Sequence, residues 1–551
     1  MNERDRLPRE LRNRAFAWIT EDVDADNREE LEAVLARAMN GEPGAVTDLA
    51  DRMSGPLRFG TAGLRGPVRA GPNGMNTTVV VRTTAGVASW LARQGKTGEM
   101  VVVGRDARYG SERFAIAAAE VLYAAGFDAR LLPGPLPTPV LAFAVKQLKA
   151  AAGVQITASH NPPADNGYKL YDSSGSQVVP PSDGEIEGAI ASAPPAVAVP
   201  RTPGVPVLGE HIVDEYVSRV AAIPVGPSRS LRVAATALHG VGADVLRRAL
   251  TAAGFTAVHL VPEQSKPDPD FPTVSFPNPE EPGATDLLVT LAAEVDADLA
   301  IALDPDADRC AVGVRDRDGS WRMLRGDETG VLLGEHVLST TSCPDPLVAT
   351  TIVSSSMLSR IAAAHCARYA ETLTGFKWLT RAGHRLVFAY EEALGLCVNP
   401  DFVRDKDGIA AAVMACDFAA TLKASGRSLL DVLDDLTIRH GVHLTDQLSS
   451  RVTDLSVRTE VLQAIRNAPP AELAGVPVSI EDLLPATDAV RISGDGLRVV
   501  IRPSGTEPKL KTYLQVVEPV SGSLEDARAV AKRRLAALRT DVSALLSNHG
   551  K

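Results

Sequence analysis

The chain has 551 residues, about three to four times the length of a typical domain, so several hydrophobic cores are expected. Hydrophobic residues make up 45% of it and charged residues 23%, which is ordinary for a globular enzyme. The formal net charge of −11 offers no basic footprint for nucleic acid and would be repelled by acidic lipid. We therefore expect neither nucleic acid nor a membrane as a partner.

The five cysteines include no C-x-x-C pair, which indicates neither a disulfide framework nor a zinc site. The N-terminus is charged and lacks the apolar centre of a signal peptide, and no stretch approaches the apolar length of a membrane span. We expect a soluble, cytoplasmic protein with reduced thiols.

The N-terminal segment, residues 1–50, has apolar residues at helical spacing, which predicts helices that wrap the first domain. Leu57–Gly66 then interrupts them with three glycines, which imply tight turns from which Arg65 projects. Taken alone, this run fits a plain turn as well as an anion site.

The next elements alternate between strand and helix. A strand is predicted at Met100–Val103, a loop at Gly104–Gly110, a helix that ends near Ala125 and a strand near Ala129–Leu132. This alternation favours a mostly parallel sheet with helices on both faces.

The segment Gln155–Gly167, Q-I-T-A-S-H-N-P-P-A-D-N-G, follows a β-rich run and presents Ser159 and His160. Pro162 and Pro163 fix the backbone and deny the loop a helix. The segment is either an ordinary turn between two strands or a rigid loop that holds a reactive serine outward.

A linker rich in alanine and proline precedes a second α/β region, whose last strand, Leu299–Leu303, runs into three aspartates. Asp304, Asp306 and Asp308 would repel one another unless a cation bound them, and oxygen ligands favour Mg²⁺. A solvated turn is the alternative. The run does not indicate an EF-hand, because the glycine and the terminal glutamate of an EF-hand loop are missing.

The third region has strands at Leu347–Val353 and Leu386–Tyr390, and Glu391 and Glu392 follow the second of them. Carboxylates at the end of such a strand suit sugar hydroxyls, although a solvated loop is also possible. Asp405–Gly408 is interpreted as a helix start capped by Asp407 or a neighbour. His239, in a glycine-rich loop, is interpreted as a packed histidine.

The last region combines hairpin-like strands with a C-terminal helix from Leu524, which predicts an α+β domain. Arg502, Ser504, Gly505 and Thr506 lie together there, close to Lys511. A guanidinium, hydroxyl groups and backbone N–H donors made accessible by a glycine suit a phosphate dianion. The alternative is an ordinary hairpin turn with polar side chains.

Four domains are therefore expected, at residues 1–206, 207–325, 326–445 and 446–551. The first three repeat the same order of strands and helices, without a clear match between individual residues.

Five motifs carry a family resemblance: T-A-S-H-N-P-P at 157–163, D-P-D-A-D-R at 304–309, G-F-K-W at 375–378, E-E-A-L-G at 391–395 and R-P-S-G-T-E-P-K at 502–509. In order and spacing they resemble the α-D-phosphohexomutase superfamily, the phosphoglucomutases and phosphomannomutases. The resemblance implies three similar α/β domains with mixed sheets and a C-terminal α+β domain, arranged around a central cleft.

The resemblance also implies roles for individual residues. Ser159 matches the serine that carries the phosphoryl group and completes the Mg²⁺ site of Asp304, Asp306 and Asp308, with one ion per chain. Arg65, His160 and Lys169 are the expected catalytic neighbours of that serine. The expected substrate-binding residues are Arg309, Gly375, Lys377, Glu391, Glu392, Arg502, Ser504, Gly505, Thr506 and Lys511, of which Glu391 matches the sugar-binding glutamate.

The resemblance implies a mutase that interconverts the 1- and 6-phosphates of glucose or mannose, activated by a sugar 1,6-bisphosphate, as a monomer or homodimer. The sugar loop of many members is G-E-x-S-G, whereas in the E-E-A-L-G of this chain Ala393 takes the position of the serine, so the serine hydroxyl is lacking. This form, with V-R-D-K-D-G after it at 403–408, looks more like the phosphopentomutase branch. Phosphopentomutase and glucose-1,6-bisphosphate synthase remain alternatives, and a Mg²⁺-dependent phosphatase is the least favoured.

Overall fold

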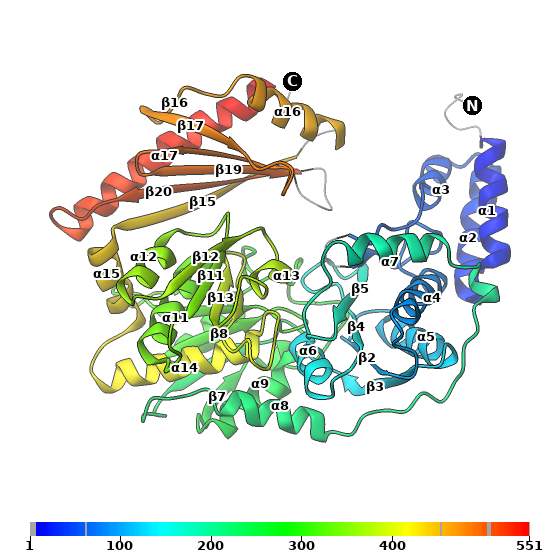
Figure 1. Cartoon of the computed structure of the whole chain (residues 1–551), viewed down its shortest axis with the longest axis horizontal. Helices are drawn as coiled ribbons and strands as arrows, with labels where there is room; N and C mark the ends of the chain where they lie inside the picture. The colour runs from blue at the N-terminus through cyan, green and yellow to red at the C-terminus, as the bar shows by residue number, and fades with distance from the viewer. Residues whose placement is uncertain (1–6, 61–62, 452–454, 504–508, 550–551) are drawn as a thin grey trace. The chain divides into compact units, whose positions relative to one another are not determined.

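The computed structural model describes residues 7–60, 63–451, 455–503 and 509–549 and contains four β-sheets (Figure 1). The chain divides into two compact units. Unit 1 comprises Met1–Met323 and Asn399–Asp417, and unit 2 comprises Leu324–Val398 and Phe418–Lys551.

The first sheet has the strand order β1-β5-β4-β2-β3. Its strands are β1 (Leu64–Pro67), β2 (Met100–Arg105), β3 (Asp128–Pro135), β4 (Ala152–Ile156) and β5 (Asp165–Asp172). The associated helices are α4 (Thr77–Arg93), α5 (Ser111–Ala124), α6 (Thr138–Gln147) and α7 (Ser182–Ala191). β2 pairs in parallel with β3 and β4, whereas β5 is antiparallel to both β4 and β1.

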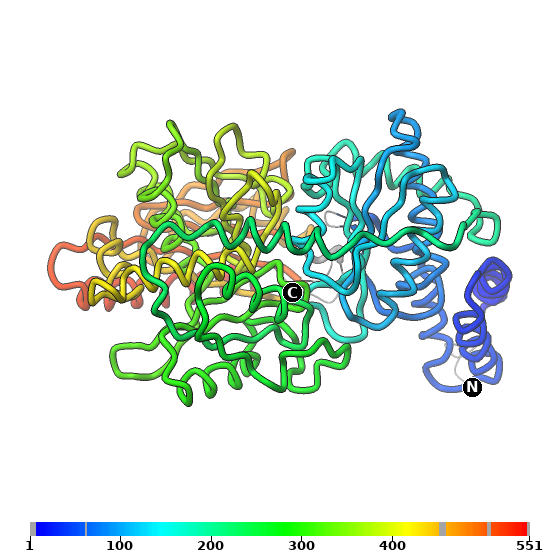
Figure 2. Tube along the Cα trace, turned by 90° about the horizontal axis from the view of Figure 1, so that it is seen from below, coloured from blue at the N-terminus to red at the C-terminus, as the bar shows by residue number. Residues whose placement is uncertain are grey.

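Three N-terminal helices precede this sheet, α1 (Arg9–Glu21), α2 (Ala25–Met39) and α3 (Ala45–Arg52). α1 and α2 lie side by side in both views (Figures 1 and 2). Leu11 and Leu31 from these helices share one apolar core with Val101 and Val154 from the sheet. The helices expected in residues 1–50 are confirmed, and burial of their apolar faces stabilises them.

The second sheet has the order β10-β9-β8-β6-β7. Its strands are β6 (Arg232–Thr236), β7 (Ala257–Leu260), β8 (Leu299–Leu303), β9 (Cys310–Arg315) and β10 (Trp321–Met323). The helices of this part are α8 (His211–Ala221), α9 (Gly242–Ala252) and α10 (Asp286–Glu294).

The third sheet has the order β12-β11-β13-β14 and lies in unit 2. Its strands are β11 (Leu347–Thr351), β12 (Arg368–Thr372), β13 (Leu386–Glu391) and β14 (Gly395–Cys397). The helices of this stretch of the chain are α11 (Gly326–Thr340), α12 (Met357–Ala364), α13 (Phe376–Leu379), α14 (Gly408–Ala424) and α15 (Leu429–His440), of which α14 begins in unit 1.

The fourth sheet is antiparallel throughout, in the order β15-β20-β19-β18-β17-β16. Its strands are β15 (Val442–Arg451), β16 (Glu472–Leu473), β17 (Val476–Asp482), β18 (Val490–Gly494), β19 (Leu497–Pro503) and β20 (Lys509–Glu518). Helices α16 (Leu455–Asn467) and α17 (Leu524–His549) pack on it, as expected for an α+β region.

The first three sheets repeat one topology. In each, a first strand (β2, β6, β11) pairs in parallel with the second strand on one side and the third on the other. The third strand (β4, β8, β13) then turns back into an antiparallel partner. The mixed sheets are confirmed, whereas the expectation of a mostly parallel sheet was wrong, because these hairpins add antiparallel pairs to every sheet.

Among the described residues, no single helix is long and apolar enough to cross a membrane; α14 and α15, which meet at a bend of 90°, reach that length and composition only as a pair.

Candidate active site

In each of the three repeats, the hairpin turn after the third strand carries one of the segments singled out from the sequence. The serine loop (residues 157–164) follows β4, the aspartate loop (304–309) follows β8 and the glutamate loop (391–395) lies at the end of β13. One topological position thus supplies three of the predicted functional segments, two of them in unit 1 and one in unit 2.

The serine loop and the aspartate loop meet in unit 1. Ser159 is buried, and its Oγ lies 2.7 Å from Asp304 Oδ2 and 3.2 Å from His160 Nδ1. Thr157 Oγ1 accepts a hydrogen bond from the Ser159 backbone N–H at 2.9 Å. The hydroxyl predicted to react therefore points at the predicted metal ligands rather than into solvent.

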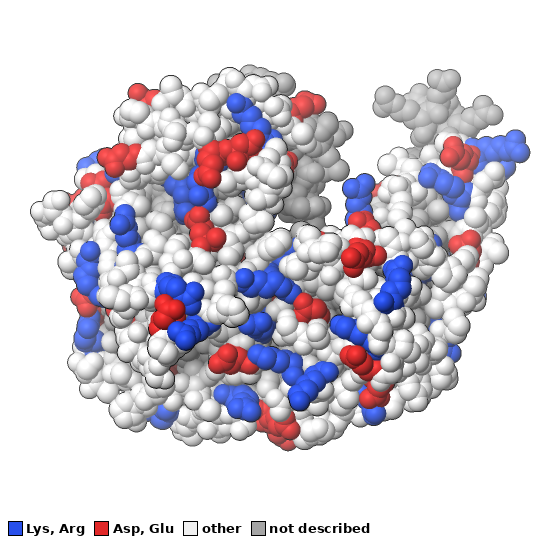
Figure 3. Space-filling view, in the orientation of Figure 1, with Lys and Arg blue, Asp and Glu red and all other residues white. Residues whose placement is uncertain are grey.

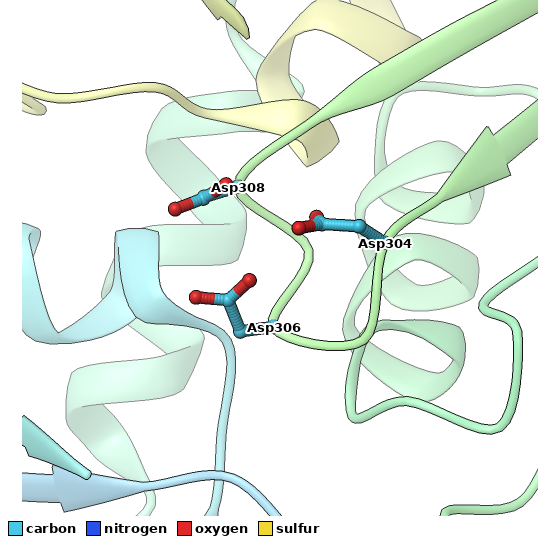
Figure 4. Close-up of side chains that lie close together, drawn as sticks. All are labelled: Asp304, Asp306 and Asp308. Atoms are coloured by element: carbon cyan, nitrogen blue, oxygen red, sulfur yellow. The ribbon is translucent and has the colours of Figure 1, made fainter. Parts of the chain in front are cut away.

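The three aspartate side chains converge on a common space (Figure 4). They are 0% exposed, and one ligand oxygen from each lies within 4.8 Å of the others. Among the described residues, the Oδ1 atoms of Asp306 and Asp308 are buried and accept no hydrogen bond. Buried carboxylate oxygens without donors fit a hard cation, so this triad could hold a divalent metal ion.

Two lysines neutralise part of this charge. Lys169 Nζ lies 2.6 Å from Asp306 Oδ2 and 3.0 Å from Asp308 Oδ2, and Lys406 Nζ lies 3.2 Å from Asp308 Oδ2. Lys169 is on β5 opposite Gln155, so the hairpin that presents the serine also presents this lysine.

The pKa values reflect this arrangement. Burial and the charges of Asp306 and Asp308 raise the pKa of Asp304 well above its ordinary value. Burial alone would raise the pKa of Asp306 and lower that of Lys169, but their mutual ion pair reverses both shifts. Asp304, the carboxyl group nearest Ser159, is therefore the one whose charged form is least stabilised by its protein neighbours.

His160 and Arg65 complete the surroundings of the serine. Burial, together with the positive charges of Arg309 and Arg65, lowers the pKa of His160 well below its ordinary value. Arg65 extends from β1, whose residue 65 pairs with Gly167, and its buried Nε has no hydrogen-bond acceptor among the described residues. Arg309 donates its backbone N–H to Asp304 Oδ1 at 3.0 Å.

Two residues at this site were not among the functional candidates from the sequence. Lys406 was placed in a structural helix start; Asp407 does cap α14 by accepting from the Ala410 N–H at 2.9 Å, which confirms that part. Thr138, at the start of α6, donates its hydroxyl to Asp306 Oδ2 at 2.6 Å. The run V-R-D-K-D-G, which contributes to the family resemblance, was the available signal for Lys406.

The backbone of the aspartate loop is also tightly packed. The Gly408 N–H donates to Ala307 O at 3.2 Å, and a Cβ atom at Gly408 would lie 2.4 Å from Arg309 O. The absence of a side chain at Gly408 therefore allows the segment that carries Lys406 to approach the loop.

The glutamate loop lies in unit 2. Glu392 accepts hydrogen bonds from Ser354 Oγ at 3.0 Å and from Thr351 Oγ1 at 3.3 Å. Burial, and next the charge of Asp327, raise the pKa of Glu392, although Arg502 opposes this shift. Glu391, which matches the sugar-binding glutamate in the resemblance, is the last residue of β13, and Ala393, at the position of the serine of G-E-x-S-G, follows in the same loop.

Arg502 and Lys511 face each other across β19 and β20, and the Arg502 guanidinium lies 5.9 Å from the Tyr513 ring centre. Burial and the charge of Glu392 raise the pKa of Tyr513, and the charge of Glu391 acts in the same direction, so the glutamate loop lies near Tyr513 and Arg502 within unit 2. Ser504, Gly505 and Thr506 lie outside the described residues.

Gly375 and Lys377 lie at the short helix α13. Gly375 has a φ of 107° immediately before the helix, a conformation that glycine adopts readily. Lys377 is buried, with its Nζ 5.4 Å from the Trp378 ring centre.

His239 is packed, as expected, with its Nε2 2.8 Å from Thr273 Oγ1. Acidic and basic side chains intermingle on the face shown in Figure 3.

Comparison with known proteins confirms the family resemblance. Models of phosphoglucomutase/phosphomannomutase match in order: alpha/beta/alpha domains I, II and III at residues 56–196, 214–319 and 325–439, and the C-terminal domain at 450–522. A Haemophilus influenzae protein named "Probable phosphomannomutase" is 42% identical over 80% of this chain and 93% of its own. A phosphoribomutase of Saccharomyces cerevisiae is 33% identical over 92% and 93%, respectively.

A solved structure of a phosphoglucomutase/phosphomannomutase family protein from Burkholderia thailandensis shares the fold, with a TM-score of 0.69 at 21% identity over 88% of this chain and 97% of the other. The full set of four matched regions extends across both units. The chain therefore belongs to the phosphoglucomutase/phosphomannomutase family, whose members are isomerases of the mutase type.

Proposed function

We propose that this protein is a phosphosugar mutase that interconverts the 1- and 6-phosphates of glucose or mannose through a phosphorylated Ser159. The observation that carries the proposal is the position of Ser159 Oγ, 2.7 Å from Asp304 within a buried cluster of three aspartates. A serine hydroxyl beside a cation site is the arrangement that phosphoryl transfer requires.

In the proposed cycle, phosphorylated Ser159 donates its phosphoryl group to the free hydroxyl of the sugar monophosphate. The bond from phosphorus to Ser159 Oγ breaks as the bond to the sugar oxygen forms, and the sugar hydroxyl gives up its proton. The proposed acceptor of that proton is His160 Nδ1, which lies 3.2 Å from Ser159 Oγ and later returns the proton. Lys169 stays paired with two carboxylates and acts through its charge.

Asp304, Asp306 and Asp308 would hold Mg²⁺, and when bound this ion would supply positive charge that offsets the charge of the transferring phosphoryl group. Glu392 and Glu391 would accept hydrogen bonds from sugar hydroxyls, and Arg502 and Lys511 would bind the phosphate that is not reacting. The sugar bisphosphate formed in the first transfer then turns around in the site, and its other phosphoryl group is transferred to Ser159. Added sugar 1,6-bisphosphate activates the enzyme by phosphorylating that serine.

The direct test is Ser159→Ala. We expect turnover of glucose 1-phosphate to fall to background because the phosphoryl carrier is removed, while thermal unfolding stays close to wild type. Ser192→Ala, which removes an exposed hydroxyl bonded to Gly188 O, is the matched control and should retain full activity. Substantial mutase activity in Ser159→Ala would overturn the proposal.

A pentose phosphate is a second candidate substrate. The specific observation is that Ala393 takes the position of the sugar-loop serine, so a hydroxyl donor is lost. The matching S. cerevisiae relative is named phosphoribomutase. A panel of glucose, mannose, glucosamine, ribose and deoxyribose phosphates, assayed with Mg²⁺ and a bisphosphate activator, distinguishes the two substrates by kcat/KM.

Release of the intermediate would make the protein a bisphosphate synthase or a phosphatase instead. Retention is favoured because Arg502 and Lys511 lie beside the glutamate loop. A time course that measures free phosphate, sugar bisphosphate and isomerised monophosphate separates the three reactions.

A further inference from the structure

Ser159 has a backbone conformation that its residue type disfavours. Its φ is 54°, in the left-handed region, which costs a non-glycine residue about 1–3 kcal/mol unless the surrounding structure enforces it. The same conformation directs Oγ toward Asp304. Within the loop, the Thr157 hydroxyl binds the Ser159 N–H, and contacts from outside the loop can hold the Ser159 carbonyl.

Arg108 makes contacts that can do this. Its Nη2 donates to Ser159 O at 2.6 Å and to Asn161 O at 2.7 Å. Its Nη1 donates to Pro162 O at 2.8 Å and to Asp165 O at 3.2 Å. One planar guanidinium thus binds four carbonyl oxygens within seven consecutive residues, a pattern that matches the rigid fork of arginine and not the single ammonium of lysine.

Arg108 is itself fixed. It is 4% exposed, its Nε lies 3.4 Å from Asp106 Oδ2, and its guanidinium carbon lies 5.0 Å from the Phe271 ring centre. Asp106 Oδ1 accepts from the Arg108 backbone N–H at 3.0 Å and from Ser111 Oγ at 2.5 Å. A buried, paired arginine of this kind loses little freedom when it binds the loop.

The other two repeats show the same support at the same topological place. After β6, the Val241 N–H donates to Pro305 O of the aspartate loop at 2.8 Å. After β11, the Ser354 hydroxyl donates to Glu392 of the glutamate loop at 3.0 Å. In each repeat, the loop after the first strand therefore contacts the loop after the third strand. In the first repeat this contact is made by Arg108, which follows β2 and uses a charged guanidinium instead of a backbone N–H or a hydroxyl.

We propose that Arg108 is a positioning residue, which holds Ser159 in its left-handed conformation and so sets the direction of the attacking or leaving Oγ. The inference rests on the proposed function, because it concerns phosphoryl transfer to and from Ser159. Arg108 acts through the four loop carbonyls, and its loss should lower kcat more than it changes KM. A misplacement of about 1 Å can cost on the order of 100-fold in rate.

The experiment measures phosphorylation of Ser159 directly. Dephosphorylated enzyme is mixed with glucose 1,6-bisphosphate and Mg²⁺, and the gain of one phosphoryl group is followed by intact mass over time. In this step the Ser159 hydroxyl loses its proton, the Oγ–phosphorus bond forms and the bond from phosphorus to the sugar oxygen breaks. We expect Arg108→Ala to slow the step by about 100-fold, and added guanidinium chloride, well below unfolding concentrations, to restore part of the rate.

Arg113→Ala is the matched control, because Arg113 lies on α5, is half-exposed and pairs with Asp24 at 2.9 Å. It should transfer at the wild-type rate with no response to guanidinium. Arg108→Lys keeps the charge and the apolar stem, so it serves where Arg108→Ala does not fold. We expect it to transfer at least about tenfold more slowly than wild type, because one ammonium cannot serve four carbonyls.

The outcomes separate the two proposals. A wild-type enzyme that never gains the phosphoryl group contradicts the proposed function. A wild-type enzyme that gains it, with folded Arg108→Lys equally fast, contradicts the role of Arg108. Slow transfer in Arg108→Ala without any guanidinium response, together with fast transfer in Arg108→Lys, also contradicts it, since charge alone would then suffice.

Discussion

Lys169 and the three aspartates share one buried charge balance. Lys169 is 2% exposed and contacts the carboxylates of Asp306 and Asp308. Burial and the charges of these two aspartates raise the pKa of Asp304. Removing one member of a buried ion pair leaves the other charged and unpaired, which is more costly than never having formed the pair. The same carboxylates that would hold a metal ion therefore depend on this lysine when no ion is bound.

We predict that Lys169→Met destabilises the metal-free protein by about 3 kcal/mol or more, because buried Asp306 loses its lysine partner and Asp308 keeps only Lys406. Added Mg²⁺ should then raise the thermal midpoint of Lys169→Met more than that of wild type, since the ion replaces the missing charge. Differential scanning fluorimetry with EDTA and with Mg²⁺ measures both effects. Lys149→Met, a lysine outside the cluster, is the control. An equal Mg²⁺ response in all three proteins would contradict the prediction.

The sequence was informative about these residues to different degrees. The aspartates could be predicted because three carboxylates two residues apart after an apolar strand repel one another strongly unless a cation lies between them. For Lys406 the run V-R-D-K-D-G was the available signal, but it did not indicate which loop the lysine contacts. Arg108 could not be predicted, because it lies far along the chain from the loop that it contacts and a single arginine in a loop carries no pattern. Their roles depend on tertiary packing, which motif spacing does not encode.

At the scale of elements, strand positions were more predictable than strand directions. Leu299–Leu303 was expected and observed as β8, and the strand expected at Leu386–Tyr390 extends by one residue as β13. β5 was missed because Asp165–Asp172 is polar at its start and does not alternate, yet it is buried by pairing between β4 and β1. The antiparallel direction of such returning strands depends on a hairpin connection, which apolar runs alone do not specify.

β15, β20 and α12 meet in unit 2 at His443. Its Nδ1 lies 3.0 Å from Gln515 Nε2, which can only donate, and 3.2 Å from Ser356 Oγ, whereas its Nε2 lies 3.3 Å from His440 O. Burial lowers the pKa of His443 to about 4, and the charges of Arg360 and Arg498 act in the same direction. The neutral ring therefore joins three elements, and protonation would place a second donor against Gln515.

The pH dependence follows from this lowered pKa. Because the folded value of about 4 lies below the ordinary value of 6.5, stability from His443 is present above pH 6.5 and is lost as the pH falls through 4. We expect a loss on the order of 2 kcal/mol, with allowance for partial exposure. Urea unfolding of wild type and His443→Gln from pH 7 to pH 4 should show a shallower decline in the variant. His384→Gln, at an exposed loop histidine, should follow wild type; parallel curves for all three proteins would refute the prediction.

At the scale of the whole molecule, the chain leaves unit 1 after Met323 and returns to it at Asn399–Asp417. The returning segment carries side chains that complete unit 1. Asp405 accepts from Tyr171 OH at 2.8 Å, Asp407 from Tyr216 OH at 2.7 Å, and Asp417 from the Val225 N–H at 3.0 Å. A contiguous fragment that ends at Met323 therefore lacks part of its own core.

We predict that residues 1–323 alone are less stable than the same fragment joined to residues 399–417 by a flexible linker. The fragment leaves the buried hydroxyl groups of Tyr171 and Tyr216 without their acceptors, each at about 1–3 kcal/mol. A Gly/Ser linker of about 20 residues, with an average span of about 25 Å, is flexible and imposes no structure of its own. Thermal unfolding by circular dichroism should give a higher midpoint for the linked protein. Asp405→Ala and Asp407→Ala in the linked protein should together remove most of that gain, because they delete the two acceptors and Asp407→Ala also removes the cap of α14. If residues 1–323 unfold at the same temperature with and without the segment, the returning chain contributes nothing to unit 1.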